Sequence, residues 1–346
     1  MRISEQPQCA GRPDVNRHHP SWSLPARLVA VLVGFSSVLG SCSSGSTLGQ
    51  ANEAGALAAR RVEQASVDGS GGVVLHMTIV GPASAADTLI TIHGGPGLSL
   101  ESMDGYNELA GQKLRVVSYD QRGAGQSAVP DDLDYSLAAQ VADLEAIRIT
   151  LGVETVQLLG QSWGGAIAAA YAATHPDHVS ALVLVGAVPL NRAEYLAGQH
   201  RFQERVGELQ RLGVIDDVIP SIHEGSCTAA FTAVLPAYLA EPTSNISVTV
   251  ASCTAETARA TYEAFLADET VPEYAARLSS FGSPTLLVAG EHDVFGPEWL
   301  ERHREILASA PTETVLIRNA GHLVIAEQPV ATLAAISTFL RKHPGP

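Results

Sequence analysis

Six short apolar runs alternate with amphipathic segments along most of the chain. The runs are rich in β-branched residues and lie at 87–93, 113–120, 155–160, 179–186, 284–290 and 313–319. Nearly continuous apolar strands that alternate with helices are typical of a parallel sheet with helices on both faces. The pattern therefore predicts an α/β protein.

The segments around these runs predict helices and a hairpin. Apolar residues recur at helical spacing over 137–151, where Gly152 follows as a helix-ending residue, and again over 330–340. Ahead of the first run, 61–67 and 72–80 flank the sequence DGSGG, which predicts an antiparallel hairpin. With this hairpin the predicted sheet has eight strands, most of them parallel.

The alternation of strands and helices stops between Asn191 and Phe281, where the chain is helix-rich and contains several prolines. A block of this size between two core strands is typical of a cap inserted over the sheet. We therefore expect a core formed by 60–190 and 282–346, and a helical cap at 191–281 that shapes a pocket.

The N-terminal segment has the pattern of an export signal. Leu28–Gly40 is an apolar run preceded by arginines, and it is too short to span a bilayer comfortably. It ends in LGSC, which resembles a bacterial lipoprotein signal, in which the peptide is cut before a cysteine that then carries the lipid. We predict a signal peptide at 1–41, lipid on Cys42 and a flexible tether at 42–59. The expected location is the outer face of the cell membrane, with ordinary secretion as the alternative.

The charge balance excludes one class of partner. The chain carries a formal net charge of −15, and the predicted leader holds more basic than acidic residues. Because the mature chain would have no basic patch, we expect no nucleic-acid partner. Its acidity would also repel an anionic membrane surface, so membrane attachment would depend on the lipid at Cys42.

Cysteine usage predicts one disulfide. Cys9 would leave with the leader and Cys42 would carry the lipid, so Cys227 and Cys253 remain. In an exported protein such a pair favours a disulfide, and two buried free thiols are the alternative. The chain has no Cys-x-x-Cys and no cluster of His and Cys, so we expect no metal site.

Ser162 is the predicted nucleophile. It lies in the pentapeptide GQSWG at 160–164, between a predicted strand and an Ala-rich helix. A Gly-x-Ser-x-Gly pattern alone is weak, because a glycine-rich turn can contain it by chance. A strand before it and a helix after it, however, place the serine on a strained turn with its hydroxyl exposed.

A serine hydroxyl needs a base, and the base needs a third group to hold it. Asp293 follows the run at 284–290, and His322 follows the run at 313–319. The order serine, aspartate, histidine is that of the α/β-hydrolase fold. Glu291 is the competing acid, and the neighbouring His292 is interpreted as a surface residue.

Acyl transfer also needs donors for the developing oxyanion. One predicted donor is the backbone N–H of Trp163, directly after the nucleophile. The other comes from the sequence HGGPG at 93–97, where we nominate the N–H of Gly95, with Gly94 as the alternative.

Three motifs in order carry a family resemblance. HGGPG at 93–97, YDQRGAGQS at 119–127 and GQSWGG at 160–165 resemble the prolyl iminopeptidase branch of the serine α/β-hydrolases. The resemblance implies release of N-terminal residues, often proline, from small peptides, without metal or organic cofactor. It also implies that Asp120 and Arg122 form an ion pair that braces the oxyanion loop.

The sequence does not identify the substrate-binding residues. Members of the family hold the substrate's free α-amine with acidic residues of the cap, and the candidates here are Glu204, Glu208, Glu224, Glu263, Asp268 and Glu269. A solvated acidic face also explains most of them. The alternatives are therefore an esterase, lactonase or amino-acid amidase on the same core, or a binding lipoprotein that has kept the fold without catalysis.

The predicted base gives a testable pH dependence. His322 must be neutral to accept the serine proton, so we expect activity to fall as the pH drops below about 6 to 7. The measurement is kcat/KM for a chromogenic ester or amide across the acid range. A flat profile down to about pH 5 would contradict this role for His322.

Overall fold

The computed structural model describes residues 62–219, 227–246, 248 and 252–345. The predicted signal peptide, the lipid site at Cys42 and the tether lie outside the described residues, as does Glu224. Export and lipid attachment therefore stay predictions. In the described part of the chain, no helix is both long enough and apolar enough to cross a bilayer.

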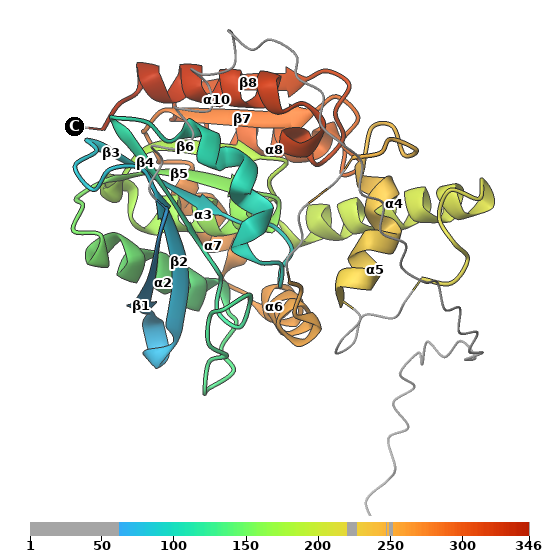
Figure 1. Cartoon of the computed structure of the whole chain (residues 1–346), viewed down its shortest axis with the longest axis horizontal. Coiled ribbons are helices and arrows are strands. Elements are labelled where there is room, and N and C mark those ends of the chain that lie inside the picture. Colours follow the sequence, from blue (N-terminus) through green and yellow to red (C-terminus); the bar gives the residue numbers. More distant parts are fainter. Residues whose placement is uncertain (1–61, 220–226, 247, 249–251, 346) are drawn as a thin grey trace, which may run out of the picture. The chain divides into compact units, whose positions relative to one another are not determined.

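Eight strands form one sheet in the order β1-β2-β4-β3-β5-β6-β7-β8 (Figure 1). Their bounds are β1 Val62–Asp68, β2 Val74–Val80, β3 Asp87–Ile92, β4 Leu114–Tyr119, β5 Val156–Gln161, β6 Val179–Val185, β7 Thr285–Gly290 and β8 Thr312–Ile317. β2 is antiparallel to both of its neighbours, and the other pairs are parallel. The prediction of a mostly parallel eight-stranded sheet, with a hairpin at its start, is confirmed.

The sheet separates two hydrophobic clusters because successive strand residues point to opposite faces. In β6, Leu182 and Leu184 pack into one cluster with the helices α2 (Leu137–Thr150), α3 (Trp163–Thr174), α7 (Val271–Leu278) and α8 (Pro297–Ile306). Val183 and Val185 pack into the other cluster with η2 (Leu100–Leu109), α9 (Val324–Glu327) and α10 (Pro329–Lys342). Side chains buried on both faces explain why the central strands appear in the sequence as continuous apolar runs.

The helices follow the strands as the apolar pattern predicts. Those of the core are α2 Leu137–Thr150, α3 Trp163–Thr174, α8 Pro297–Ile306, α9 Val324–Glu327 and α10 Pro329–Lys342, with the 3-10 turns η1 Ser70–Gly72, η2 Leu100–Leu109 and η3 Pro176–His178. Ser136 caps α2 by accepting the N–H of Ala139, and Gly152 lies just beyond its end at a φ of 66°.

Between β6 and β7 lie α4 Arg192–Arg211, α5 Cys227–Val234, η4 Leu235–Tyr238, α6 Ala255–Ala267 and α7 Val271–Leu278. This is the span predicted to form the cap. The last of these helices, α7, packs along α3 of the core. The remaining helices of the span supply one wall of the cavity described below.

Candidate active site

Ser162 lies at a sharp turn between β5 and α3. It has a φ of 52° and a ψ of −118°, a conformation that residues other than glycine rarely adopt. Its N–H donates to the carbonyl of Val185 at 2.9 Å, and its carbonyl accepts from the N–H of Gly165 and of Val188, each at 2.9 Å. The surrounding backbone therefore holds the strained serine in place.

The two glycines of the pentapeptide are required by close packing. A Cβ on Gly160 would lie 2.4 Å from the carbonyl oxygen of Gly164, and a Cβ on Gly164 would lie 2.1 Å from that of Ile92. Both distances are well inside van der Waals contact. Only glycine lets the start of α3 approach β3 and β5 this closely.

His322 and Asp293 form a buried pair. Nδ1 of His322 lies 3.1 Å from Oδ1 and 3.0 Å from Oδ2 of Asp293, whose Oδ1 also accepts the N–H of Phe295 at 3.0 Å. Because a carboxylate accepts, Nδ1 carries the proton in the neutral imidazole, and Nε2 then has the lone pair. Nε2 is buried and has no hydrogen-bond partner among the described residues.

The loop that carries His322 is bonded to the cap. The N–H of His322 donates to the carbonyl of Tyr238 at 2.8 Å. Oε1 of Glu327 accepts the N–H of Gly321, and its Oε2 accepts the N–H of Ala240, each at 2.8 Å. Burial raises the pKa of the Glu327 carboxyl group. The position of the imidazole therefore depends on the cap as well as on the core.

Ser162 and His322 line the same cavity of about 710 Å³, which lies between the core and the predicted cap. Asp293 lies behind the histidine, where it contacts a smaller, separate cavity. The alternative acid Glu291 is half exposed, and its carboxylate lies near the exposed ring of His292. The structure therefore places Asp293, and not Glu291, against His322.

The HGGPG loop passes directly beside the serine. A Cβ on Gly94 would lie 3.2 Å from Cβ and 3.8 Å from Oγ of Ser162. Both Gly94 and Gly95 line the cavity. The first four N–H groups of a helix have no partner inside it, which leaves the N–H of Trp163 available for a ligand. The choice between Gly95 and Gly94 as the second donor stays a prediction.

His93 fixes the start of this loop. It is fully buried, its Nδ1 donates to the carbonyl of Gly94 at 2.8 Å, and its Nε2 accepts the N–H of Gln121 at 3.1 Å. Burial lowers the pKa of the imidazole below its ordinary value. His93 is therefore a neutral structural residue that ties the loop to the end of β4.

The predicted ion pair between Asp120 and Arg122 is wrong. The Arg122 guanidinium instead binds Asp143 of α2 through Nε at 2.8 Å and Nη2 at 2.7 Å, and the pair is buried. Asp120 accepts the N–H of Leu100 at 2.7 Å and of Gln126 at 2.9 Å. The chain turns at Arg122, so the Arg122 side chain faces α2 and the Asp120 side chain does not. Through the N–H of Leu100, Asp120 still holds the segment that follows the predicted oxyanion loop.

The cavity wall holds carboxylates that the sequence did not single out. None of the predicted cap acids among the described residues lines the cavity. On the exposed side of α4, Glu204 lies beside His200, and Glu208 lies beside Arg205. Glu101 and Asp104, both in η2 of the core, do line the cavity. Within the described residues no group of three or more His, Cys, Asp or Glu side chains is arranged to hold a metal ion.

Comparison with known proteins is consistent with this geometry. Residues 87–209 match the family model described as the alpha/beta hydrolase fold. A proline iminopeptidase of Levilactobacillus brevis is 30% identical over an alignment of 281 residues that covers 74% of this chain and 88% of that protein.

Two solved structures share the fold at lower identity. A proline iminopeptidase of Mycobacterium smegmatis has a TM-score of 0.58 at 21% identity, over 81% of this chain and 98% of that one. A thermophilic esterase of Thermogutta terrifontis has a TM-score of 0.58 at 23% identity, over 82% of this chain and 100% of that one.

The sheet, the turn at Ser162 and the family match together define an α/β-hydrolase. Since the Levilactobacillus brevis enzyme is similar over most of its length, the chain belongs to the proline iminopeptidase family.

The close packing at the turn gives a stability prediction. Gly164→Ala should lower the free energy of unfolding by about 3 kcal/mol and abolish activity, because an added Cβ would force α3 away from β3. Denaturant unfolding and ester hydrolysis measure the two effects.

Gly207→Ala in α4 is the matched control, since a Cβ there meets nothing within 4 Å. It should leave activity unchanged and raise stability by up to about 1 kcal/mol, because alanine is the better helix former. Equal behaviour of the two variants would contradict the packing argument.

Proposed function

We propose that this protein is a serine hydrolase that releases N-terminal residues, of the proline type, from small peptides. The observation that carries the proposal is the cavity in which Ser162 and the unpartnered Nε2 of His322 both lie. The family match supports a peptide substrate, and the triad roles are part of the proposal.

In the proposed mechanism, Oγ of Ser162 attacks the acyl carbon while its proton passes to Nε2 of His322. Asp293 holds Nδ1–H and stabilises the imidazolium. The N–H groups of Trp163 and Gly95 stabilise the oxyanion, each typically worth about 2.7 to 4 kcal/mol. His322 then gives the proton to the leaving amine, which breaks the scissile bond and leaves an acyl-enzyme. Water, deprotonated by the same nitrogen, releases the acyl group.

The wall of the cavity supports a substrate with a free amine. Oε2 of Glu101 is buried and has no hydrogen-bond partner among the described residues. The pKa of the neighbouring Asp104 is raised, first by partial burial and then by the negative charge of Glu101. A substrate ammonium group would supply the missing partner and relieve this repulsion. Arg259, a cation on the same wall, is already paired with Glu263 at 3.0 Å.

The cavity is otherwise mostly apolar, which favours a compact hydrophobic residue at the acyl position. Aromatic rings supply much of this wall, namely Tyr195, Phe202, Phe231, Tyr238, Tyr262 and Phe295. The same surface would accept the acyl group of an ester, so esterase activity is the second candidate function.

A panel of three substrates tests the proposal. Proline p-nitroanilide should be cleaved, N-acetylproline p-nitroanilide should not, and Ser162→Ala should lower turnover by about 10⁴-fold or more. A fluorophosphonate probe should label the parent and not this variant. Turnover of p-nitrophenyl acetate alone would identify an esterase, and an unlabelled parent would indicate a non-catalytic binding protein.

The amine-binding role of Glu101 has its own test. Glu101→Gln should raise KM for proline p-nitroanilide by about 10- to 100-fold, the effect of losing one charged hydrogen bond. Its kcat/KM for p-nitrophenyl acetate, which has no amine, should stay unchanged. Glu204→Gln is the control, because that exposed carboxylate does not line the cavity and should leave both substrates unaffected. An equal loss on both substrates in Glu101→Gln would contradict the role.

A further inference from the structure

One segment of the predicted cap pairs directly with the oxyanion loop. Cys253 forms an isolated antiparallel bridge with Leu98, the residue that follows the HGGPG sequence. The N–H of Thr254 donates to the carbonyl of Gly97 at 2.8 Å. The loop is therefore bordered on its outer side by residues of the cap.

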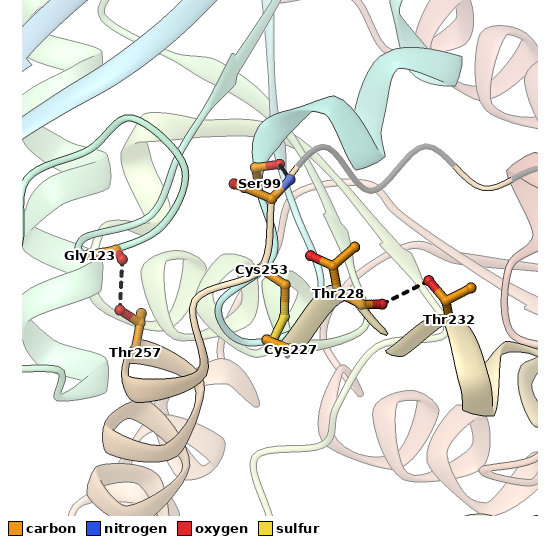
Figure 2. The surroundings of a disulfide bond; sticks show 8 residues. Ser99, Gly123, Cys227, Thr228, Thr232, Cys253 and Thr257 are labelled. Atoms are coloured by element: carbon orange, nitrogen blue, oxygen red, sulfur yellow. Dashed lines mark hydrogen bonds between the residues drawn. A yellow bond between two sulfur atoms is a disulfide. The ribbon is translucent and has the colours of Figure 1, made fainter. Parts of the chain in front are cut away.

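The same segment makes two more bonds to the core. The N–H of Ser252 donates to Oγ of Ser99 at 3.2 Å, and the buried hydroxyl of Thr257 donates to the carbonyl of Gly123 at 2.7 Å. Figure 2 shows Cys253 on the segment between these bonds, with Ser99 to one side and the Thr257–Gly123 bond to the other. We call residues 252–257 the seam.

The seam lies tightly against the loop. Gly97 has a φ of 86°, and a Cβ there would lie 2.6 Å from the carbonyl oxygen of Thr254 and 2.9 Å from the Cβ of Ala258. Contacts this close leave no free space between loop and seam. A displacement of the seam would therefore displace the loop.

A covalent bond fixes the seam from the other side. Cys253 is joined to Cys227 at the start of α5, with their Cα atoms 5.4 Å apart (Figure 2). Both cysteines line the cavity that holds Ser162, and Cys227 is buried. The disulfide thus joins two parts of the cavity wall that are 26 residues apart in the sequence.

We propose that the Cys227–Cys253 disulfide positions the oxyanion loop through the seam, so that its reduction lowers the rate of acyl transfer while the core stays folded. The inference rests on the proposed serine hydrolase function. The disulfide acts through Thr254, Gly97 and the loop, and does not itself touch the reacting atoms.

The size of the effect follows from the geometry that oxyanion stabilisation requires. A donor has to lie about 2.7 to 3.1 Å from the oxyanion, and a displacement of about 1 Å can cost about 100-fold in rate. Without the disulfide, hydrogen bonds and packing alone would hold the seam. The disulfide joins two segments of the predicted cap, so the stability of the core strands would change little.

The reduction itself is a simple exchange. A dithiol such as dithiothreitol gives two electrons and two protons to the disulfide, which becomes the thiols of Cys227 and Cys253. The dithiol becomes a cyclic disulfide. Removal of the reductant and exposure to oxidised glutathione would reverse the step.

The test compares the oxidised and reduced forms of the full chain. Reduction should lower kcat for p-nitrophenyl acetate and the labelling rate of Ser162 by a fluorophosphonate by about 10- to 100-fold. KM should change by less than about threefold, because Tyr195 and Phe202 of α4 and Phe295 of the core keep their places in the cavity wall. Thiol titration measures the extent of reduction, and far-ultraviolet circular dichroism confirms that the core is folded.

Variants separate positioning from general stability. The double variant Cys227→Ser and Cys253→Ser should have the low kcat of the reduced parent and no response to reductant. Ser99→Ala keeps the disulfide and removes one bond of the seam, so it should lower kcat by about threefold to tenfold even if the double variant fails to fold. Thr232→Ala is the control. Among the described residues its hydroxyl donates only to the carbonyl of Thr228 within α5, so this variant should behave as the parent (Figure 2).

Two outcomes would overturn the proposal, and they can be told apart. Equal labelling and equal kcat after complete reduction would contradict the positioning role alone and leave the disulfide as a stabilising crosslink. Absence of labelling in both forms would contradict the proposed hydrolase function and this inference with it.

Discussion

The contact between the start of α3 and the end of β3 is the constraint on which the site depends. With no side chain on Gly164, the helix comes close enough to the Ile92 carbonyl for Ser162 to sit at a strained turn above the sheet. The HGGPG loop leaves β3 directly after Ile92, so Gly94 lies against the same serine. One close approach therefore places both the predicted nucleophile and the predicted oxyanion loop.

Features that depend on neighbouring residues could be predicted from the sequence. The central strands β3 to β7 end within a residue or two of the apolar runs, because burial on both faces leaves a continuous local pattern. The turn at Ser162 was predictable for a similar reason, since a strand, two glycines and a helix follow one another in the chain. The Cys227–Cys253 bond joins distant residues, yet it could be predicted because only these two cysteines remained after the predicted leader and lipid site were set aside.

Features that depend on the folded surface could not be predicted in this way. Arg122 has Asp120 two residues away, yet it pairs with Asp143 of α2, because the turn after β4 directs its side chain toward that helix. The cap acids looked equally suitable as amine ligands, whereas the carboxylates that reach the cavity are Glu101 and Asp104 of η2. Sequence spacing carries no information on which acidic side chain faces a cavity formed by distant segments.

The cap contacts both halves of the proposed catalytic machinery. The carbonyl of Tyr238 accepts the N–H of His322, and the N–H of Thr254 donates to the carbonyl of Gly97. The predicted base and the oxyanion loop are therefore each bonded to the element whose side chains shape the acyl pocket. A substitution that reshapes this pocket would also move groups that act on the transition state. For substitutions that reshape the pocket wall, substrate preference and turnover would consequently change together.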